Sequence, residues 1–287
     1  MSNINMANIS KTFGDINALK NVSLSLEKNK IYGLLGRNGA GKTTMLNIIS
    51  NKIFPTSGDV EIDGIHLNRA STNLPNIYVA DEKNLYPESM KVKDVFKWTK
   101  EFYADFDLSK AFELAREYYL LPDKKVKELS TGYNTILKDI IGLCVNTEFV
   151  FFDEPVLGLD ANHRDMFYKH LLQSYLGNES TYVVSTHLID EVANIIENVI
   201  IINQGEIIRD TTCEKLLSEG YTVSGTIENV DKFIAGKTII GTDVLANTKA
   251  AYVLSEDDIK TTSSSIEISK MNLQKLFIEL TKKEEEQ

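Results

Sequence analysis

A glycine-rich stretch near residue 40 has the residue types and the spacing needed to bind a chain of phosphates. It reads Gly36-Arg37-Asn38-Gly39-Ala40-Gly41-Lys42-Thr43-Thr44 and fits the pattern G-x-x-x-x-G-K-[ST] completely. Glycines let successive backbone N–H groups turn toward phosphates, and the N-terminus of a following helix favours an anion. Lys42 would reach the β and γ phosphates, and Thr43 would offer its hydroxyl to Mg²⁺. The stretch therefore predicts a site for a nucleoside triphosphate.

The segments on either side of this loop have the patterns that such a site needs. Residues 31–35 are apolar and predict a buried strand, whereas residues 43–50 carry Leu46, Ile48 and Ile49 with helical spacing. The alternative is a glycine-rich turn before an ordinary helix, but the complete motif makes a chance match rare. A loop between a strand and a helix is the arrangement in which this motif binds phosphates.

A second apolar run, residues 149–152, ends in the two acids Asp153 and Glu154. At the end of a core strand, Asp153 would hold Mg²⁺ through its water shell, and Glu154 would act as the general base for an attacking water. Two acids before Pro155 would also suit the start of a helix. Their position after a phosphate-binding loop favours the catalytic interpretation.

Three further segments have a definite order relative to these two motifs: the first lies between the phosphate-binding loop and the paired acids, and the other two lie after the acids. Leu129-Ser130-Thr131-Gly132-Tyr133 precedes an apolar helix, Gly158-Leu159-Asp160 follows the paired acids, and a β-branched strand at residues 181–186 ends at His187. A single histidine after a strand is more often structural than catalytic. The order of all the motifs reverses that expectation for His187.

With these motifs the chain resembles the nucleotide-binding subunit of an ABC transporter over nearly all of its length. The resemblance implies an α/β fold: a P-loop NTPase core of the ABC ATPase type, with an antiparallel β subdomain, a helical subdomain and a small C-terminal α+β accessory domain. It also implies ATP and Mg²⁺ as cofactors. The residues that match the family's motifs are Phe13 for stacking on adenine; Gly36, Asn38, Gly39, Gly41, Lys42, Thr43 and Thr44 of the Walker A loop; Ser130 and Gly132 of the signature loop; Asp153 and the catalytic Glu154 of Walker B; residues 158–160 of the D-loop; and His187 as the switch histidine.

Four positions depart from the family pattern or leave alternatives open. Thr131 and Tyr133 replace the Gly and Gln of the usual L-S-G-G-Q signature, and a β-branched residue narrows the backbone choices there. Asp81 stands where the family has the Q-loop glutamine; it could bind Mg²⁺ directly, lie out of reach, or cap a strand. Phe13 is equally well explained as a plain core aromatic.

Charge and hydropathy restrict the partners. The chain has 287 residues and a net charge of −10, which disfavours binding to a nucleic-acid backbone. Its longest apolar runs are too short to span a bilayer, and its N-terminus lacks the features of a signal peptide. Cys144, in a predicted core helix, and Cys213, at a predicted surface turn, suit unpaired thiols in a reducing compartment. We therefore expect a location at the cytoplasmic face of the cell membrane, reached only through partner subunits.

The domain organisation follows from the same anchors. Residues 1–211 are expected to form the ATPase domain, with short strands at 4–9, 22–26, 31–35 and 58–62 and a helical subdomain at about 90–146. Residues 212–287 are expected to form the accessory domain, with strands near 221–227, 238–240, 251–254 and 266–269, a last helix around Leu276, and a frayed end at 282–286. Aromatic residues of the helical block, such as Trp98 and Phe102, suit either a helix core or, in the family, a groove for a membrane subunit.

Three classes of function remain open. The first is an exporter ATPase that works with separate transmembrane permease subunits and with a second, identical or different, ATP-binding subunit. In its signature loop and last helix the chain is similar to the Gram-positive subfamily that exports antimicrobial or cytolytic peptides, such as the phenol-soluble modulin exporters, and to YtrB-like subunits. The second is a soluble ABC ATPase in a process other than transport, which would need a second cassette or a coiled coil. The third is a poorly hydrolysing regulatory subunit, favoured by Asp81, Thr131 and Tyr133.

Overall fold

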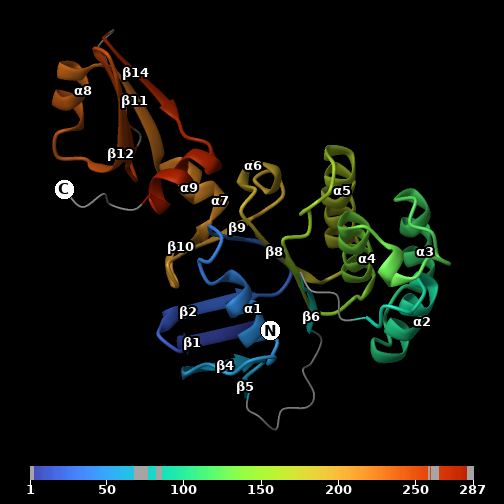
Figure 1. The fold of residues 1–287 in the computed structure, drawn as a ribbon. Helices are drawn as coiled ribbons and strands as arrows, with labels where there is room; N and C mark the ends of the chain where they lie inside the picture. The colour runs from blue at the N-terminus through green and yellow to red at the C-terminus, as the bar shows by residue number, and fades with distance from the viewer. Residues whose placement is uncertain (1–2, 68–76, 82–85, 258, 260–264, 283–287) are drawn as a thin grey trace. The chain divides into compact units, whose positions relative to one another are not determined.

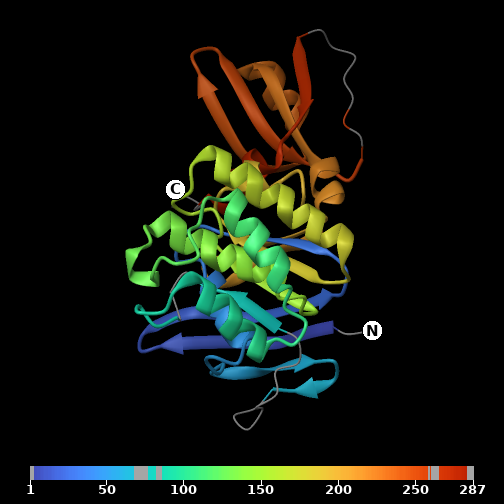
Figure 2. The ribbon, with the colours of Figure 1, turned by 90° about the vertical axis from the view of Figure 1, so that its right-hand side faces the viewer.

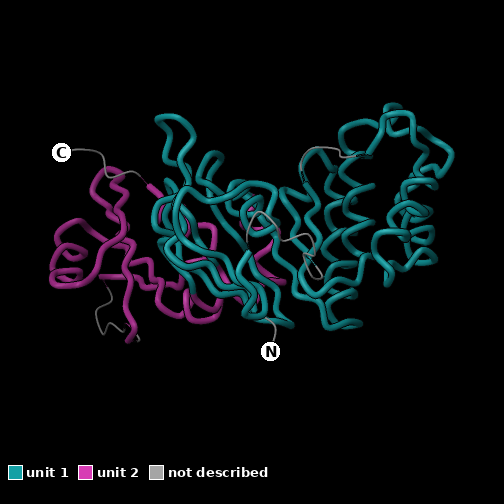
Figure 3. The backbone as a smooth tube through the Cα atoms, turned by 90° about the horizontal axis from the view of Figure 1, so that it is seen from below, with its two compact units in different colours: residues 1–187, 200–210 teal, residues 188–199, 211–287 magenta. Residues whose placement is uncertain are grey.

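The computed structural model describes residues 3–67, 77–81, 86–257, 259 and 265–282, and the chain divides into two compact units (Figure 3). Unit 1 comprises residues 1–187 and 200–210, and unit 2 comprises residues 188–199 and 211–287. The sequence suggested one boundary between residues 211 and 212. The structure adds to unit 2 a segment, 188–199, that sequence composition did not distinguish.

The largest sheet in the described residues has six strands in the order β10-β9-β3-β8-β7-β6 (Figure 1). Strands β3, β8, β7 and β6 are parallel to their neighbours, and every residue of these four strands is buried, as expected for continuous apolar runs covered on both faces. Parallel strands end at the same edge of a sheet, so the residues that follow them converge there. The bounds are β3 Ile31–Leu35, β6 Ile77–Ala80, β7 Phe149–Asp153, β8 Thr181–Thr186, β9 Asn198–Asn203 and β10 Glu206–Thr212.

An antiparallel sheet with the order β2-β1-β4-β5 forms the β subdomain of unit 1. Helix α1 (Lys42–Ile49) buries Met45, Leu46, Ile48 and Ile49 in a hydrophobic core that contains residues of both sheets. This shared core fixes the start of α1 relative to the edge where the parallel strands end. The strands are β1 Asn3–Phe13, β2 Ile16–Glu27, β4 Ser57–Ile62 and β5 Ile65–His66, and they include the segments predicted from the sequence.

The described residues of unit 1 also form four further helices and one 3₁₀ helix, with α2, α3 and α4 grouped at one side of the six-stranded sheet (Figures 1 and 2). The side chains of Asp107, Ser130 and Asp160 cap α3, α4 and α5 by accepting backbone N–H groups, which sets where these helices begin. None of the helices in the described ranges has the length and hydrophobicity of a membrane span. The bounds are α2 Val92–Phe102, α3 Leu108–Glu117, the 3₁₀ helix Val126–Glu128, α4 Thr131–Cys144 and α5 Ala161–Gly177.

Aromatic residues of the helical block fall into two groups. Phe96 is fully buried and contacts the rings of Phe106 and Phe112, as a helix core requires. Trp98 and Phe102 lie on the same helix but are 43% and 66% exposed. The helix-core alternative therefore holds for Phe96, whereas a groove for a membrane subunit at the exposed Trp98 and Phe102 stays a prediction.

Unit 2 is an α+β structure built on the antiparallel sheet β12-β13-β11-β14, with α8 packed on it around Val223, Val230 and Val253. Sequence analysis found the strands and the last helix but not α7 or α8. It was wrong about Cys213, which is buried as the first residue of α7 instead of lying at a surface turn. The bounds are α6 Ile189–Val192, α7 Cys213–Glu219, β11 Gly220–Thr226, α8 Ile227–Ile234, β12 Thr238–Leu245, β13 Thr248–Leu254, β14 Ile266–Lys270 and α9 Leu273–Thr281.

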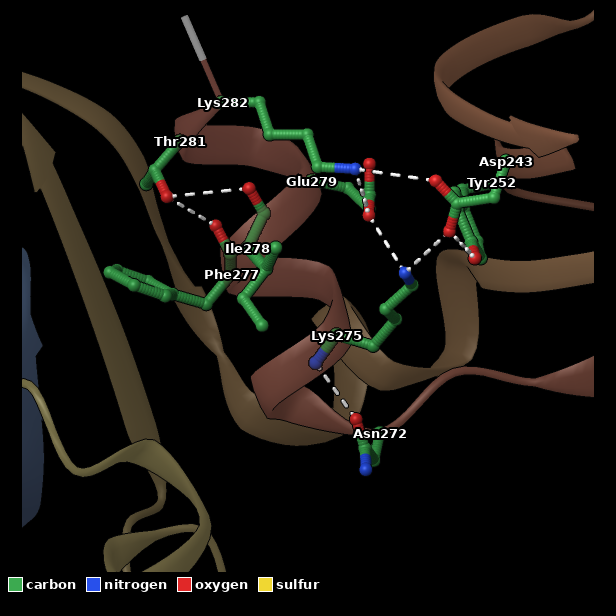
Figure 4. A network of polar contacts seen from close by, with 9 residues as sticks. All are labelled: Asp243, Tyr252, Asn272, Lys275, Phe277, Ile278, Glu279, Thr281 and Lys282. Carbon is green, nitrogen blue, oxygen red and sulfur yellow. Dashed lines mark hydrogen bonds and ion pairs between the residues drawn. The ribbon is translucent and has the colours of Figure 1, made fainter.

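Ion pairs from lysines at α9 to Asp243 of β12 link this helix to the sheet (Figure 4). The side chain of Glu279 is fully buried and lies 2.9 Å from the ammonium of Lys275 and 2.7 Å from that of Lys282. Both lysines also pair with Asp243, whose pKa is lowered chiefly because the Tyr252 hydroxyl donates a hydrogen bond to it. Lys282, expected to belong to a frayed end, is thus held in ion pairs, while residues 283–286 lie outside the described ranges.

Candidate nucleotide-binding and catalytic site

A cavity of about 560 Å³ opens where the parallel strands of the six-stranded sheet end. Most of the residues predicted from the sequence to bind or hydrolyse a nucleotide line it, together with residues from the β1–β2 region and from the turn between β9 and β10. The lining residues include Ile16, Asn17, Ala18, Asn38, Gly39, Gly41, Lys42, Thr43, Thr44, Glu154, His187, Gln204 and Gly205.

The glycine-rich loop has the backbone that its sequence requires. Gly41 has φ +113°, a region that side chains rarely adopt, and a Cβ there would lie 2.7 Å from the carbonyl oxygen of Ala18. The turn between β9 and β10 supports the loop, because the backbone N–H of Gly205 donates to the carbonyl of Ala40 at 3.0 Å. The first turn of α1 thereby presents its free N–H groups to the cavity.

Lys42 lies at the centre of the site with only 6% of its side chain exposed. Its ammonium donates to the carbonyl of Gly36 at 2.7 Å and lies 3.2 Å from Oε1 of Glu154. A buried cation needs such partners, because removing it from water without them is costly. The same ammonium is the group that the sequence assigned to the phosphates.

Glu154 is held from two sides. Its Oε2 lies 2.9 Å from Nδ1 of His187, while its Oε1 faces Lys42, and the side chain is 14% exposed. Its backbone has φ +54°, and its N–H donates to the carbonyl of Ser185 at 2.9 Å, so the residue turns out of β7 immediately after the strand ends. The two residues predicted to be catalytic, Glu154 and His187, are therefore in direct contact.

Asp153 and Thr43 are the predicted metal-binding residues that the structure brings together. The Thr43 hydroxyl donates to Oδ2 of Asp153 at 2.7 Å, and the Ser185 hydroxyl donates to Oδ1 at 2.8 Å. Burial raises the pKa of Asp153, and the hydrogen bonds from Thr43 and Ser185 oppose that rise. A hydroxyl and a carboxylate are hard oxygen donors of the kind that Mg²⁺ takes alongside phosphates and water. Sequence reasoning missed Ser185, although it directly precedes Thr186 and His187 at the end of β8.

Asp81 forms its contacts with residues other than Thr43 and Asp153. Its carboxylate forms an ion pair with the ammonium of Lys52, and its backbone carbonyl accepts a hydrogen bond from Lys138 at 2.8 Å. The next four residues of the predicted Q-loop, 82–85, lie outside the described ranges. A metal-binding role for Asp81 stays a prediction, and its observed partner is a lysine.

Phe13 lies at the end of β1 with 49% of its surface exposed, and the ammonium of Lys11 lies 4.9 Å from its ring centroid. The alternative of a plain core aromatic is therefore wrong. Stacking of Phe13 on adenine stays a prediction.

Ser130 and Gly132 of the signature loop are not among the residues that line the cavity. Ser130 is exposed, and its hydroxyl caps α4 by accepting the N–H of Tyr133 at 3.3 Å. Of the predicted ATP contacts, these two residues are therefore set apart from the phosphate-binding loop of their own chain.

Comparison with known proteins agrees with this geometry. A family model described as ABC transporter matches residues 19–157. Two Bacillus subtilis proteins named as ABC transporter ATP-binding proteins are similar: YtrB, 31% identical over 66% of this chain and 65% of its own length, and YhaQ, 30% identical over 69% of this chain and 67% of its own length. The linearmycin resistance ATP-binding protein LnrL of the same organism is 26% identical over 96% of both chains.

Solved structures of ATP-binding cassettes share the fold. The dimeric cassette MJ0796 is 25% identical with a TM-score of 0.66, covering 73% of this chain and 98% of its own. A second structure of MJ0796, described as a post-hydrolysis state bound to ADP and Pi, is 26% identical with a TM-score of 0.65. The chain belongs to the ABC transporter ATP-binding family, and it is an ATPase cassette of that family.

The contacts of Glu154 lead to a first prediction. Glu154→Gln keeps the size of the side chain but cannot take a proton from water, so we expect ATP hydrolysis to fall by roughly 10²-fold or more. ATP affinity should stay within a few-fold, because Lys42 and the loop backbone remain in place. Steady-state ATPase assays and nucleotide-binding titrations measure the two effects. Glu206→Gln, an exposed acid on β10, is the matched control, and equal turnover of the Glu154 variant and the native protein would remove Glu154 from the role of base.

The position of Asp81 leads to a second prediction. Because Lys52 already neutralises its charge, we expect Asp81→Gln to leave the preference between Mg²⁺ and Mn²⁺ unchanged and to keep ATPase activity within a few-fold. Lys52→Gln, which removes the other partner, should have a similar effect. ATPase assays across titrations of both metals provide the measurement. A shift of the metal optimum in Asp81→Gln, without one in Lys52→Gln, would instead assign Asp81 to the metal.

Proposed function

We propose that this chain is the ATP-binding and ATP-hydrolysing subunit of an ABC exporter, that it dimerises on ATP, and that separate membrane subunits carry the substrate. The observation that carries this proposal is the grouping of Lys42, Glu154 and His187 around one cavity that the signature loop of the same chain does not complete. The site has what hydrolysis needs except the groups that Ser130 and Gly132 would add.

In the proposed reaction each residue has a distinct task. Lys42 binds the β and γ phosphates, and Glu154 takes the proton from the attacking water. His187, 2.9 Å from the carboxylate, orients Glu154 toward that water. Thr43 and Asp153 would hold Mg²⁺, which neutralises charge on the phosphates.

Dimerisation would supply the missing groups. Ser130 and Gly132 of one subunit would approach the phosphates bound by the loop of the other, so each nucleotide would form part of the interface. The dimeric structure of the related cassette MJ0796 supports this arrangement for the family. A closed two-fold pair makes the same contacts twice.

Exposed aromatic side chains on α2 support the proposal that this chain binds a membrane protein. The rings of Trp98 and Phe102 pack edge to face with centroids 4.7 Å apart, and Tyr86 lies 6.1 Å from Trp98. Exposed aromatic clusters are characteristic of protein interfaces. We propose that transmembrane permease subunits bind here and hold the ATPase at the cytoplasmic face of the membrane.

The export of a peptide or drug-like compound is proposed from a relative of similar length. LnrL, whose name assigns it to linearmycin resistance, aligns with 96% of this chain, including the region that forms unit 2. The alternative of a poorly hydrolysing regulatory subunit is disfavoured by the paired Glu154 and His187. A soluble ABC ATPase outside transport is disfavoured by the exposed α2 cluster.

ATP-driven association gives a third prediction. In Glu154→Gln with Mg-ATP, light scattering should show a dimer, whereas nucleotide-free and ADP-bound protein should be mainly monomeric, because only the triphosphate links both subunits. Ser130→Arg in the same background should abolish the dimer by placing a bulky cation at the interface. A monomer in the presence of Mg-ATP would contradict homodimerisation.

The α2 cluster gives a fourth prediction. The double variant Trp98→Ser, Phe102→Ser should retain ATPase activity within about twofold, since both side chains are exposed, but it should no longer co-purify with the membrane fraction of cells that express it. Leu176→Ser, which removes an apolar side chain that is 76% exposed on α5, is the control. Unchanged co-purification of the double variant would place the membrane partner elsewhere.

A further inference from the structure

The signature loop and the D-loop of this chain are packed directly against each other. A Cβ at Gly132 would lie 2.9 Å from the carbonyl oxygen of Gly158, so this close approach requires glycine. In the next turn of α4, the Thr135 hydroxyl donates to the carbonyl of Leu157 at 3.2 Å. The two loops therefore share a contact surface within one subunit.

His163, in the first turn of α5, contacts both loops. Its backbone N–H donates to Oδ1 of Asp160 at 2.9 Å, and its Nδ1 lies 2.9 Å from Oδ2 of the same carboxylate. The pKa of Asp160 is lowered chiefly by that backbone hydrogen bond. The imidazole edge also meets the ring of Tyr133, with centroids 6.5 Å apart and an angle of 60°. His163 thus joins the last D-loop residue to the last residue of the signature loop.

A buried tyrosine fixes the orientation of this imidazole. Tyr118, at the end of α3, is 1% exposed, and its ring stacks on that of His163 with centroids 5.8 Å apart and an angle of 20°. The ring of His170, two turns further along α5, lies 5.8 Å from the same tyrosine and pairs with Glu117 at 3.0 Å. Because Tyr118 is packed from both sides, the His163 ring cannot turn without losing its stacking partner.

We propose that His163 is a positioning residue for ATP-driven dimerisation: through Asp160 and Tyr133 it holds the D-loop and the signature loop as one rigid element, so that both reach the nucleotide of the facing subunit together. Tyr133, which replaces the usual glutamine of the signature, supplies the ring that makes this contact. The inference rests on the dimerisation in the proposed function, but the contact itself exists within one subunit and is testable in the monomer.

The first test is therefore hydrogen exchange of the nucleotide-free monomer. In His163→Ala, amide protection should fall about tenfold in residues 131–135 and in residues 157–161 alike, because the lost side chain contacts a residue of each loop. His163→Phe keeps the ring between Tyr118 and Tyr133 and the backbone N–H bond to Asp160 but loses the imidazole contact with Asp160, so it should preserve protection at 131–135 more than at 157–161. His66→Ala is the control, since it removes an exposed histidine of β5 that contacts neither loop nor Tyr118. Loss of protection confined to 157–161 in His163→Ala would overturn the proposal.

The second test measures association in the Glu154→Gln background. His163→Ala should raise the concentration for half-dimerisation with Mg-ATP about tenfold, the size expected for losing a charge-assisted hydrogen bond and an aromatic contact. Affinity of the monomer for ATP should stay within twofold. If His163→Ala dimerises as its parent does, His163 has no positioning role. If the parent itself stays monomeric, dimerisation in the proposed function fails, and the exchange experiment still decides the link between the loops.

Discussion

The burial of one lysine ammonium organises the nucleotide site. Lys42 has lost nearly all contact with water, so its charge must be balanced by groups that stay near it. Glu154 supplies the opposite charge and Gly36 a carbonyl oxygen, and His187 holds the far side of the same carboxylate. An arriving triphosphate would offer this lysine a stronger set of anionic partners. In the proposed function, nucleotide binding would replace the Lys42–Glu154 ion pair with one between Lys42 and the phosphates, and it would free Glu154 to act as the base.

The six-stranded sheet makes that arrangement precise. Strands β3, β8 and β7 are adjacent and parallel, and each ends at the same edge with a functional segment: the phosphate-binding loop, Thr186 with His187, and Asp153 with Glu154. Because all three strands are fully buried, their ends cannot shift independently. The distances of 2.7–3.2 Å among these side chains are a consequence of strand order.

The surface loops and unit 2 do not depend on the charge balance around Lys42. The signature loop, the D-loop and the α2 aromatics are on or near the surface, where we propose that contacts with other subunits are made. Unit 2 has its own small core and its own buried ionic network around Glu279, so it is stabilised without any group from the nucleotide site. Chemistry, association and the accessory domain are thus built from separate sets of interactions.

The sequence alone determined the phosphate-binding loop, the paired acids after an apolar strand, the order of the motifs and the α/β class, because each depends on local residue types and spacing. It left alternatives open for Phe13 and Asp81 and wrongly placed Cys213 at a surface turn, because exposure and ion pairing depend on residues far away in the chain. Asp81 meets Lys52, Phe13 meets solvent and Lys11, and Cys213 is covered by the packing of unit 2. The contact between His163 and Tyr133 crosses from α5 to α4 and leaves no pattern in the sequence. Only the tertiary structure brings such pairs within reach, since strand order and helix packing set which surfaces meet.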